Sequence, residues 1–90
     1  PVKNTESNNN DGGVAYMFEV REIKIGDSGN DVLLAQEILG SRGYYEGALD
    51  RKFGNLMDAA TKDYQKDRGG AAGPVDGIIG KKCWADMIAL

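Results

Sequence analysis

The chain has 90 residues, of which 41% are hydrophobic and 28% charged, and no apolar run approaches the roughly 20 residues that span a bilayer. Its 11 Lys and Arg residues against 14 Asp and Glu residues give a net charge of −3, without the basic patch of a nucleic-acid-binding protein. Because it has no histidine and Cys83 is its single cysteine, Ser-His and Cys-His catalytic pairs and the usual zinc ligands are excluded.

The first residues are predicted to lie outside the folded domain. Residues 1–13 are polar and include three consecutive asparagines, so they cannot bury enough apolar surface to offset chain entropy and should form a flexible linker. Residues 14–22 should form an extended arm. Every second residue there is β-branched or aromatic, namely Val14, Tyr16, Phe18 and Val20. The folded domain then covers residues 23–90.

Within that domain the first predicted helix follows Ser28. Ser28 can serve as its N-cap with Asp31 three residues later, and Gly40 and Gly43 end it. Its core face carries Val32, Ala35 and Leu39.

Two further helices follow. One is expected over residues 55–68, where Met57, Ala60 and Tyr64 repeat at helical spacing. The last is expected over residues 81–89. Three of its apolar side chains should face inward: Trp84, Met87 and Ile88.

A six-residue pattern precedes each of the last two helices. The two copies are Leu49-Asp50-Arg51-Lys52-Phe53-Gly54 and Val75-Asp76-Gly77-Ile78-Ile79-Gly80. In each copy the Asp can bond backbone amides in a tight turn, the large apolar residue can anchor the loop, and the Gly permits the helix to begin. The chain is therefore predicted to contain an internal loop-helix repeat.

This ordered set of motifs resembles the type 1 peptidoglycan-binding domain family. The matching positions run from the start of the first helix to the last one: Gly26, Gly29, Val32, Gln36, Leu39, Gly43-Tyr44-Tyr45, Gly47, Asp50, Phe53, Gly54, Ala60, Tyr64, Gln65, Asp76-Gly77-Ile78-Ile79-Gly80 and Trp84. Arg51 stands where the family usually has Gly, so the first loop is expected to form a different turn. The resemblance implies an all-α fold, a compact three-helix orthogonal bundle, here with a short N-terminal extended arm.

The resemblance also implies a function and a set of site residues. The domain would bind bacterial cell-wall peptidoglycan without cutting it, and would direct an attached amidase, peptidase or endolysin to the wall, outside the cell. No cofactor, metal or catalytic residue is expected. The ligand-binding candidates are Tyr44, Tyr45, Asp50, Arg51, Lys52 and Tyr64. Among them, Tyr45 would stack on a sugar, Arg51 would pair with a carboxylate, and Asp50 would order the loop.

The structural candidates are Gln36, Phe53, Gly54, Gln65, Asp76, Gly80 and Trp84. Gln36 and Gln65 either contact a ligand or satisfy backbone groups of the Asp-containing loops, and the second interpretation is favoured. Two other functions stay open. The same fold could be a protein-interaction module that uses residues 14–22 to form oligomers or to dock a partner. It could also be a glycosidase with Asp50 and Asp76 as its acid/base pair, although their place in a repeat favours a loop-stabilising role.

Overall fold

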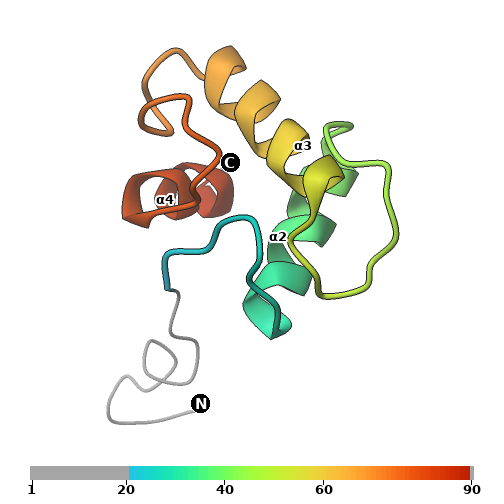
Figure 1. The fold of residues 1–90 in the computed structure, drawn as a ribbon. Coiled ribbons are helices and arrows are strands. Elements are labelled where there is room, and N and C mark those ends of the chain that lie inside the picture. The colour runs from blue at the N-terminus through green and yellow to red at the C-terminus, as the bar shows by residue number, and fades with distance from the viewer. Residues whose placement is uncertain (1–20, 90) are drawn as a thin grey trace, which may run out of the picture.

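The computed structural model describes residues 21–89, so the predicted linker and nearly all of the predicted arm lie outside the described residues. Within that range the chain forms three α-helices, α2 (Asn30–Ser41), α3 (Asn55–Asp67) and α4 (Lys81–Ala89). The helices cross at steep angles, and the long loop between α2 and α3 curves around one side of the domain (Figure 1). The all-helical, three-helix fold predicted from the sequence is confirmed, and the helix bounds agree closely with the expected ones.

The three helices bury the faces that the spacing predicted. Val32, Ala35 and Leu39 of α2 pack against buried residues of the other two helices in one core. That core also includes Trp84 and Met87 of α4. The prediction for Ile88 was wrong, because its side chain is 54% exposed. It follows Met87 by one residue, a turn of about 100° around the helix, which carries it off the buried face.

The start of α2 differs from the prediction. The N-cap is Gly29, which makes no side-chain cap hydrogen bond, and the capping role expected of Ser28 is not observed. Ser28 is instead drawn into an antiparallel bridge with Lys52. Arg21 stabilises the N-terminal end of α2, because its guanidinium donates to the Asp31 carboxylate and, at 2.8 Å, to the Ser28 carbonyl.

The segment before α2 joins both copies of the repeat. Ile23 and Ile79 exchange backbone hydrogen bonds of 3.1 and 2.8 Å, which fixes the segment to the loop before α4. The Gly26 amide donates to the Phe53 carbonyl at 2.9 Å, and the Phe53 amide donates to Asp27 at the same distance. Figure 1 shows this segment running between α4 and α2. It therefore holds the two loops in a fixed relation to one another.

Candidate functional site

The first Asp loop, residues 49–54, is held by a buried glutamine of α2. The Gln36 side-chain amide donates to the Asp50 carboxylate at 3.0 Å and to the Lys52 carbonyl at 3.1 Å, while its oxygen accepts from the Arg51 amide at 3.1 Å. The Lys52 amide also donates to Asp50, at 3.0 Å. The structural role favoured for Gln36 thus corresponds to the contacts observed.

The second Asp loop, residues 75–80, repeats this arrangement on α3. The Gln65 amide donates to the Asp76 carboxylate at 3.2 Å and to the Ile78 carbonyl at 2.9 Å, and its oxygen accepts from the Asp76 and Gly77 amides. The Ile78 amide donates to Asp76 at 2.9 Å. The internal repeat predicted from the sequence is therefore a repeat of hydrogen bonding as well as of residue type.

The turns of the two loops are alike, contrary to the prediction that Arg51 would change the first one. Arg51 has φ 65° and Gly77, at the equivalent position, has φ 78°. Both lie in the left-handed region, where a non-glycine residue costs about 1–2 kcal/mol. The Gln36 oxygen bonded to the Arg51 amide holds this conformation in spite of the cost.

Asp50 is ionised and fixed. Hydrogen bonds from Gln36 and from the Lys52 amide lower the pKa of its carboxyl below the ordinary value, because both donors stabilise the charged form. An acid catalyst in a glycosidase needs a raised pKa instead. The environment of Asp50 is thus that of a loop-ordering carboxylate.

A hollow of about 450 Å³, which we name groove 1, lies beside the first Asp loop and the start of α3. It is lined by Tyr45, Ala48, Asp50, Lys52, Gly54, Asn55, Leu56 and Met57. Two of the candidate ligand-binding residues with exposed side chains, Asp50 and Lys52, meet there. Groove 1 thus combines a carboxylate, an ammonium group and an amide with apolar surface, a mixture suited to a small polar ligand.

A second hollow of about 220 Å³, which we name groove 2, lies beside the second Asp loop and the start of α4. It is lined by Glu22, Ala72, Gly73, Pro74, Asp76, Ile78, Gly80, Lys81, Lys82 and Cys83. None of the ligand-binding residues predicted from the sequence lines this groove.

The stacking role predicted for Tyr45 does not fit its position. Only 8% of the residue is exposed, and its hydroxyl donates to the Ala48 carbonyl and accepts from Gln36 at 3.2 Å. Burial also raises the pKa of this phenol. Tyr45 therefore stabilises one side of groove 1, and its ring is too buried to stack on a sugar.

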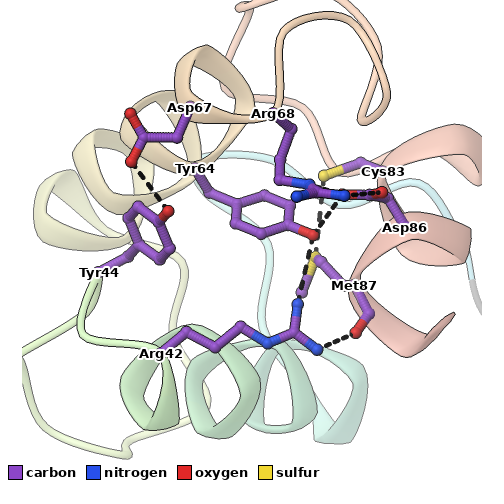
Figure 2. A network of polar contacts seen from close by, with 8 residues as sticks. All are labelled: Arg42, Tyr44, Tyr64, Asp67, Arg68, Cys83, Asp86 and Met87. Atoms are coloured by element: carbon purple, nitrogen blue, oxygen red, sulfur yellow. Dashed lines mark hydrogen bonds and ion pairs between the residues drawn. The ribbon is translucent and has the colours of Figure 1, made fainter. Parts of the chain in front are cut away.

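Tyr64 is likewise a core residue, against its place among the ligand-binding candidates. It is 1% exposed and its hydroxyl contacts Asp86 and Arg42. Burial, reinforced by the Asp86 carboxylate, raises the pKa of Tyr64 to about 12. Arg68 completes the cluster with bonds of 2.7 and 3.0 Å to Asp86 (Figure 2). These contacts join α3 to α4 and leave Tyr64 outside both grooves.

Tyr44 belongs to the same cluster. Its ring meets that of Tyr64 edge-on with centroids 5.4 Å apart, and its hydroxyl donates to Asp67 at 2.9 Å (Figure 2). It is half-buried and does not line groove 1. Arg51 is exposed, and its guanidinium donates to Asn30 at 3.0 Å. The structure therefore brings only part of the predicted ligand set together.

Two residues that line groove 1, Asn55 and Leu56, were missed. Leu56 is 67% exposed, although the neighbouring Met57 is buried. The signal was available in the sequence, because Leu56 is a large apolar residue that lies off the face formed by Met57, Ala60 and Tyr64. Single exposed apolar residues are common on protein surfaces, so Leu56 becomes a candidate for contact with a ligand only because it lines groove 1.

The described residues offer little other chemistry. Burial raises the pKa of the Cys83 thiol to about 11, so it stays protonated near neutral pH. Among residues 21–89 there is no group of three or more potential ligands that could hold a metal ion. In the same range no helix has the length and apolar character needed to cross a membrane.

Fold and grooves together define a small helical binding domain built from two loop-helix units. The profile of the family described as "Putative peptidoglycan binding domain" matches residues 28–87, two thirds of the chain. The chain therefore belongs to this family of peptidoglycan-binding domains. A search of curated proteins found no match.

Solved structures support the same conclusion. The N-terminal domain of SleB is 33% identical, with a TM-score of 0.74, over 80% of this chain and 94% of its own. A peptidoglycan-binding protein from Clostridioides difficile, solved in complex with glutamine hydroxamate, is 34% identical, with a TM-score of 0.68, over 74% of this chain and 40% of its own. A Burkholderia AP3 phage endolysin is 27% identical, with a TM-score of 0.67, over 78% of this chain and 25% of its own. In the last two proteins, a domain like this one is a minor part of a longer chain.

Proposed function

We propose that this domain binds bacterial cell-wall peptidoglycan without cleaving it, and that groove 1 is its contact surface. Family membership over residues 28–87 supports the ligand class. The observation that carries the choice of surface is the exposed Leu56 beside the fixed Asp50 carboxylate in a hollow of about 450 Å³. A sugar-peptide polymer presents apolar ring faces next to hydroxyl, amide and carboxylate groups, and groove 1 offers a partner for each.

The roles follow from how each side chain is held. Asp50 orders the loop and keeps one side of its carboxylate toward Gln36 and the Lys52 amide. The exposed Lys52 ammonium in groove 1 would attract wall carboxylates, and the exposed Arg51 guanidinium, which donates to Asn30 outside the lining of groove 1, would add to the positive charge nearby. Leu56 supplies the apolar contact that was expected of Tyr45.

The binding serves an attached enzyme. In this proposal the domain holds a wall hydrolase on an insoluble substrate, which raises the local concentration of substrate to the order of mM for a short flexible linker. Its likeness to a domain of a phage endolysin supports this arrangement. The protein would then act at the bacterial cell wall.

Co-sedimentation with purified sacculi tests the proposal. The wild-type chain should pellet with sacculi, and the turbidity of the suspension should stay constant because nothing is cleaved. Leu56→Ala and Lys52→Ala should each weaken binding about fivefold, since each removes a contact worth about 1 kcal/mol. Lys66→Ala, on an exposed position of α3 that lines neither groove, is the matched control.

The proposal fails if the wild-type chain stays in the supernatant with every wall preparation. Concentration-dependent mass in light scattering would then favour a protein-interaction module. A falling turbidity that Asp50→Asn abolishes would favour the glycosidase interpretation.

A further inference from the structure

Grooves 1 and 2 are equivalent in the internal repeat. A shift of 26 residues carries Asp50 onto Asp76, and the same shift carries seven of the eight positions that line groove 1 onto positions that line groove 2. The glutamine that holds the loop is also equivalent in its contacts, as Gln36 is to Gln65. If groove 1 is a ligand site, groove 2 has the architecture of another.

The two grooves differ in the charge of the side chains at equivalent positions. Positions 55 and 56 of groove 1 hold an amide and a leucine, whereas Lys81 and Lys82 hold the equivalent positions of groove 2. Both lysines are exposed. The stem of Lys82 lies along Gly73, since a side chain added there would meet its Cβ at 3.9 Å. Groove 2 thus carries two ammonium groups, whereas groove 1 carries only that of Lys52, and both of these long side chains can reach an anion bound in groove 2.

Cys83 gives groove 2 a small, uncharged lining residue, and the Asp76 carboxylate, which also lines this groove, accepts hydrogen bonds from the Gln65 amide and the Ile78 amide. Cys83 lies at the position of Met57 and is buried, and its thiol is protonated because burial raises its pKa to about 11. The hollow has about 220 Å³, half the volume of groove 1.

Glu22 lies at the mouth of this groove. Its carboxylate oxygen is 3.9 Å from the point where a side chain on Gly80 would begin, directly before α4. A negative charge from the chain itself therefore lies in the lining of groove 2, where it opposes the binding of a carboxylate.

We infer that groove 2 is a second ligand site, which takes a free carboxylate of the peptide stems of the wall between Lys81 and Lys82. This inference rests on the proposed function, because it assumes that the domain contacts peptidoglycan. Groove 1 would then contact the polymer through its apolar surface and the single Lys52 ammonium, while the two lysines of groove 2 bind the free carboxylate of the attached peptide. A wall whose stem carboxylates are amidated would be bound through groove 1 alone.

NMR titration of the full chain with two soluble muropeptides tests this inference. One muropeptide has free stem carboxylates and the other has them amidated. The free acid should shift the amide signals of Gly73 and Gly80 as well as that of Gly54 in groove 1, whereas the amidated form should shift Gly54 only. Lys81→Ala combined with Lys82→Ala should weaken binding of the free acid about fivefold, and should leave binding of the amidated form unchanged.

Glu22→Gln provides a test of opposite sign, because it should tighten binding of the free acid about twofold by removing the repulsion. Lys66→Ala, which removes one exposed charge elsewhere, should change neither titration. Equal shifts at Gly73 and Gly80 with both muropeptides, or no shifts there while Gly54 responds, would overturn the inference and leave the proposed function standing. If Gly54 is also silent and the chain does not pellet with sacculi, the proposed function fails as well.

Discussion

Gln36 offers the sharpest test of how the candidate site is built. Its side chain is buried. The two N–H groups of its amide lie within hydrogen-bond distance of the Asp50 carboxylate, the Lys52 carbonyl and the Tyr45 hydroxyl, and its oxygen accepts from the Arg51 amide. We consider Gln36→Met, which keeps nearly the same length and volume but removes every strong donor and acceptor. Such a variant separates the hydrogen bonds from the packing of the side chain.

The expected loss can be worked from these contacts. Leaving a buried backbone group unpaired costs about 1–3 kcal/mol. Two backbone groups, the Arg51 amide and the Lys52 carbonyl, lose their partner, but both belong to exposed residues that water reaches in part. The lower end of the range therefore applies, about 1 kcal/mol for each group. With the lost contact to the charged Asp50, the free energy of unfolding should fall by about 3 kcal/mol.

That loss is large for this domain. At about 0.05–0.15 kcal/mol per residue, a domain of about 70 residues has a free energy of unfolding of roughly 3–10 kcal/mol. Urea unfolding followed by the fluorescence of Trp84, which is buried, measures the change. Glu37→Ala, at the exposed neighbouring position of α2, is the control and should change stability by less than about 0.5 kcal/mol.

The equivalent variant Gln65→Met should lose a similar amount, because the Gln65 amide makes matching contacts with the second Asp loop. If Gln36→Met unfolds at the same urea concentration as Glu37→Ala, the hydrogen bonds to the first Asp loop do not stabilise the fold. Gln36 would then not be the residue that holds the first Asp loop.

Four further experiments test the loops, the Asp86 cluster and the core. Arg51→Gly should leave stability unchanged or raise it by up to about 1 kcal/mol, because it relieves the left-handed strain at φ 65°. Gly77→Ala should lower stability clearly in thermal melts, because its added Cβ would meet the Asp58 carboxylate. Hydrogen bonds from the Arg68 guanidinium and the Tyr64 phenol lower the pKa of Asp86 below its ordinary value. The ionised carboxylate therefore stabilises the fold above the ordinary pKa, and this stabilisation is lost as the pH falls through the lowered pKa. Between pH 6 and pH 3, measured by denaturant melts, Asp86→Asn should thus lose less stability than the wild type. The Cys83 thiol, with a pKa of about 11, should react with a thiol reagent at pH 8 only after unfolding, and rapid labelling of the native chain would contradict its burial.

The two loop-helix units could be predicted from the sequence because their signals are local. An Asp that closes a tight turn, a large apolar residue and a Gly before a helix act within six residues, and the periodic apolar residues of each helix act within four. The helix bounds, the repeat and the buried faces, with the exception of Ile88, were therefore predicted correctly. The candidacy of Asp50 and Lys52 followed from the same loop, and both line groove 1.

Exposure and partnership at longer range were decided by the tertiary structure. Tyr45 was predicted to stack on a sugar and Tyr64 was a ligand-binding candidate, but their hydroxyls donate hydrogen bonds to the Ala48 carbonyl and the Asp86 carboxylate. Ser28 looks like a helix cap until its backbone is found bridged to Lys52. Each of these outcomes depends on contacts between segments that are distant in the sequence. A pattern of neighbouring residues does not show which distant group will contact a given side chain. The sequence therefore determined which elements form, whereas packing decided which of their side chains remain free to meet a ligand.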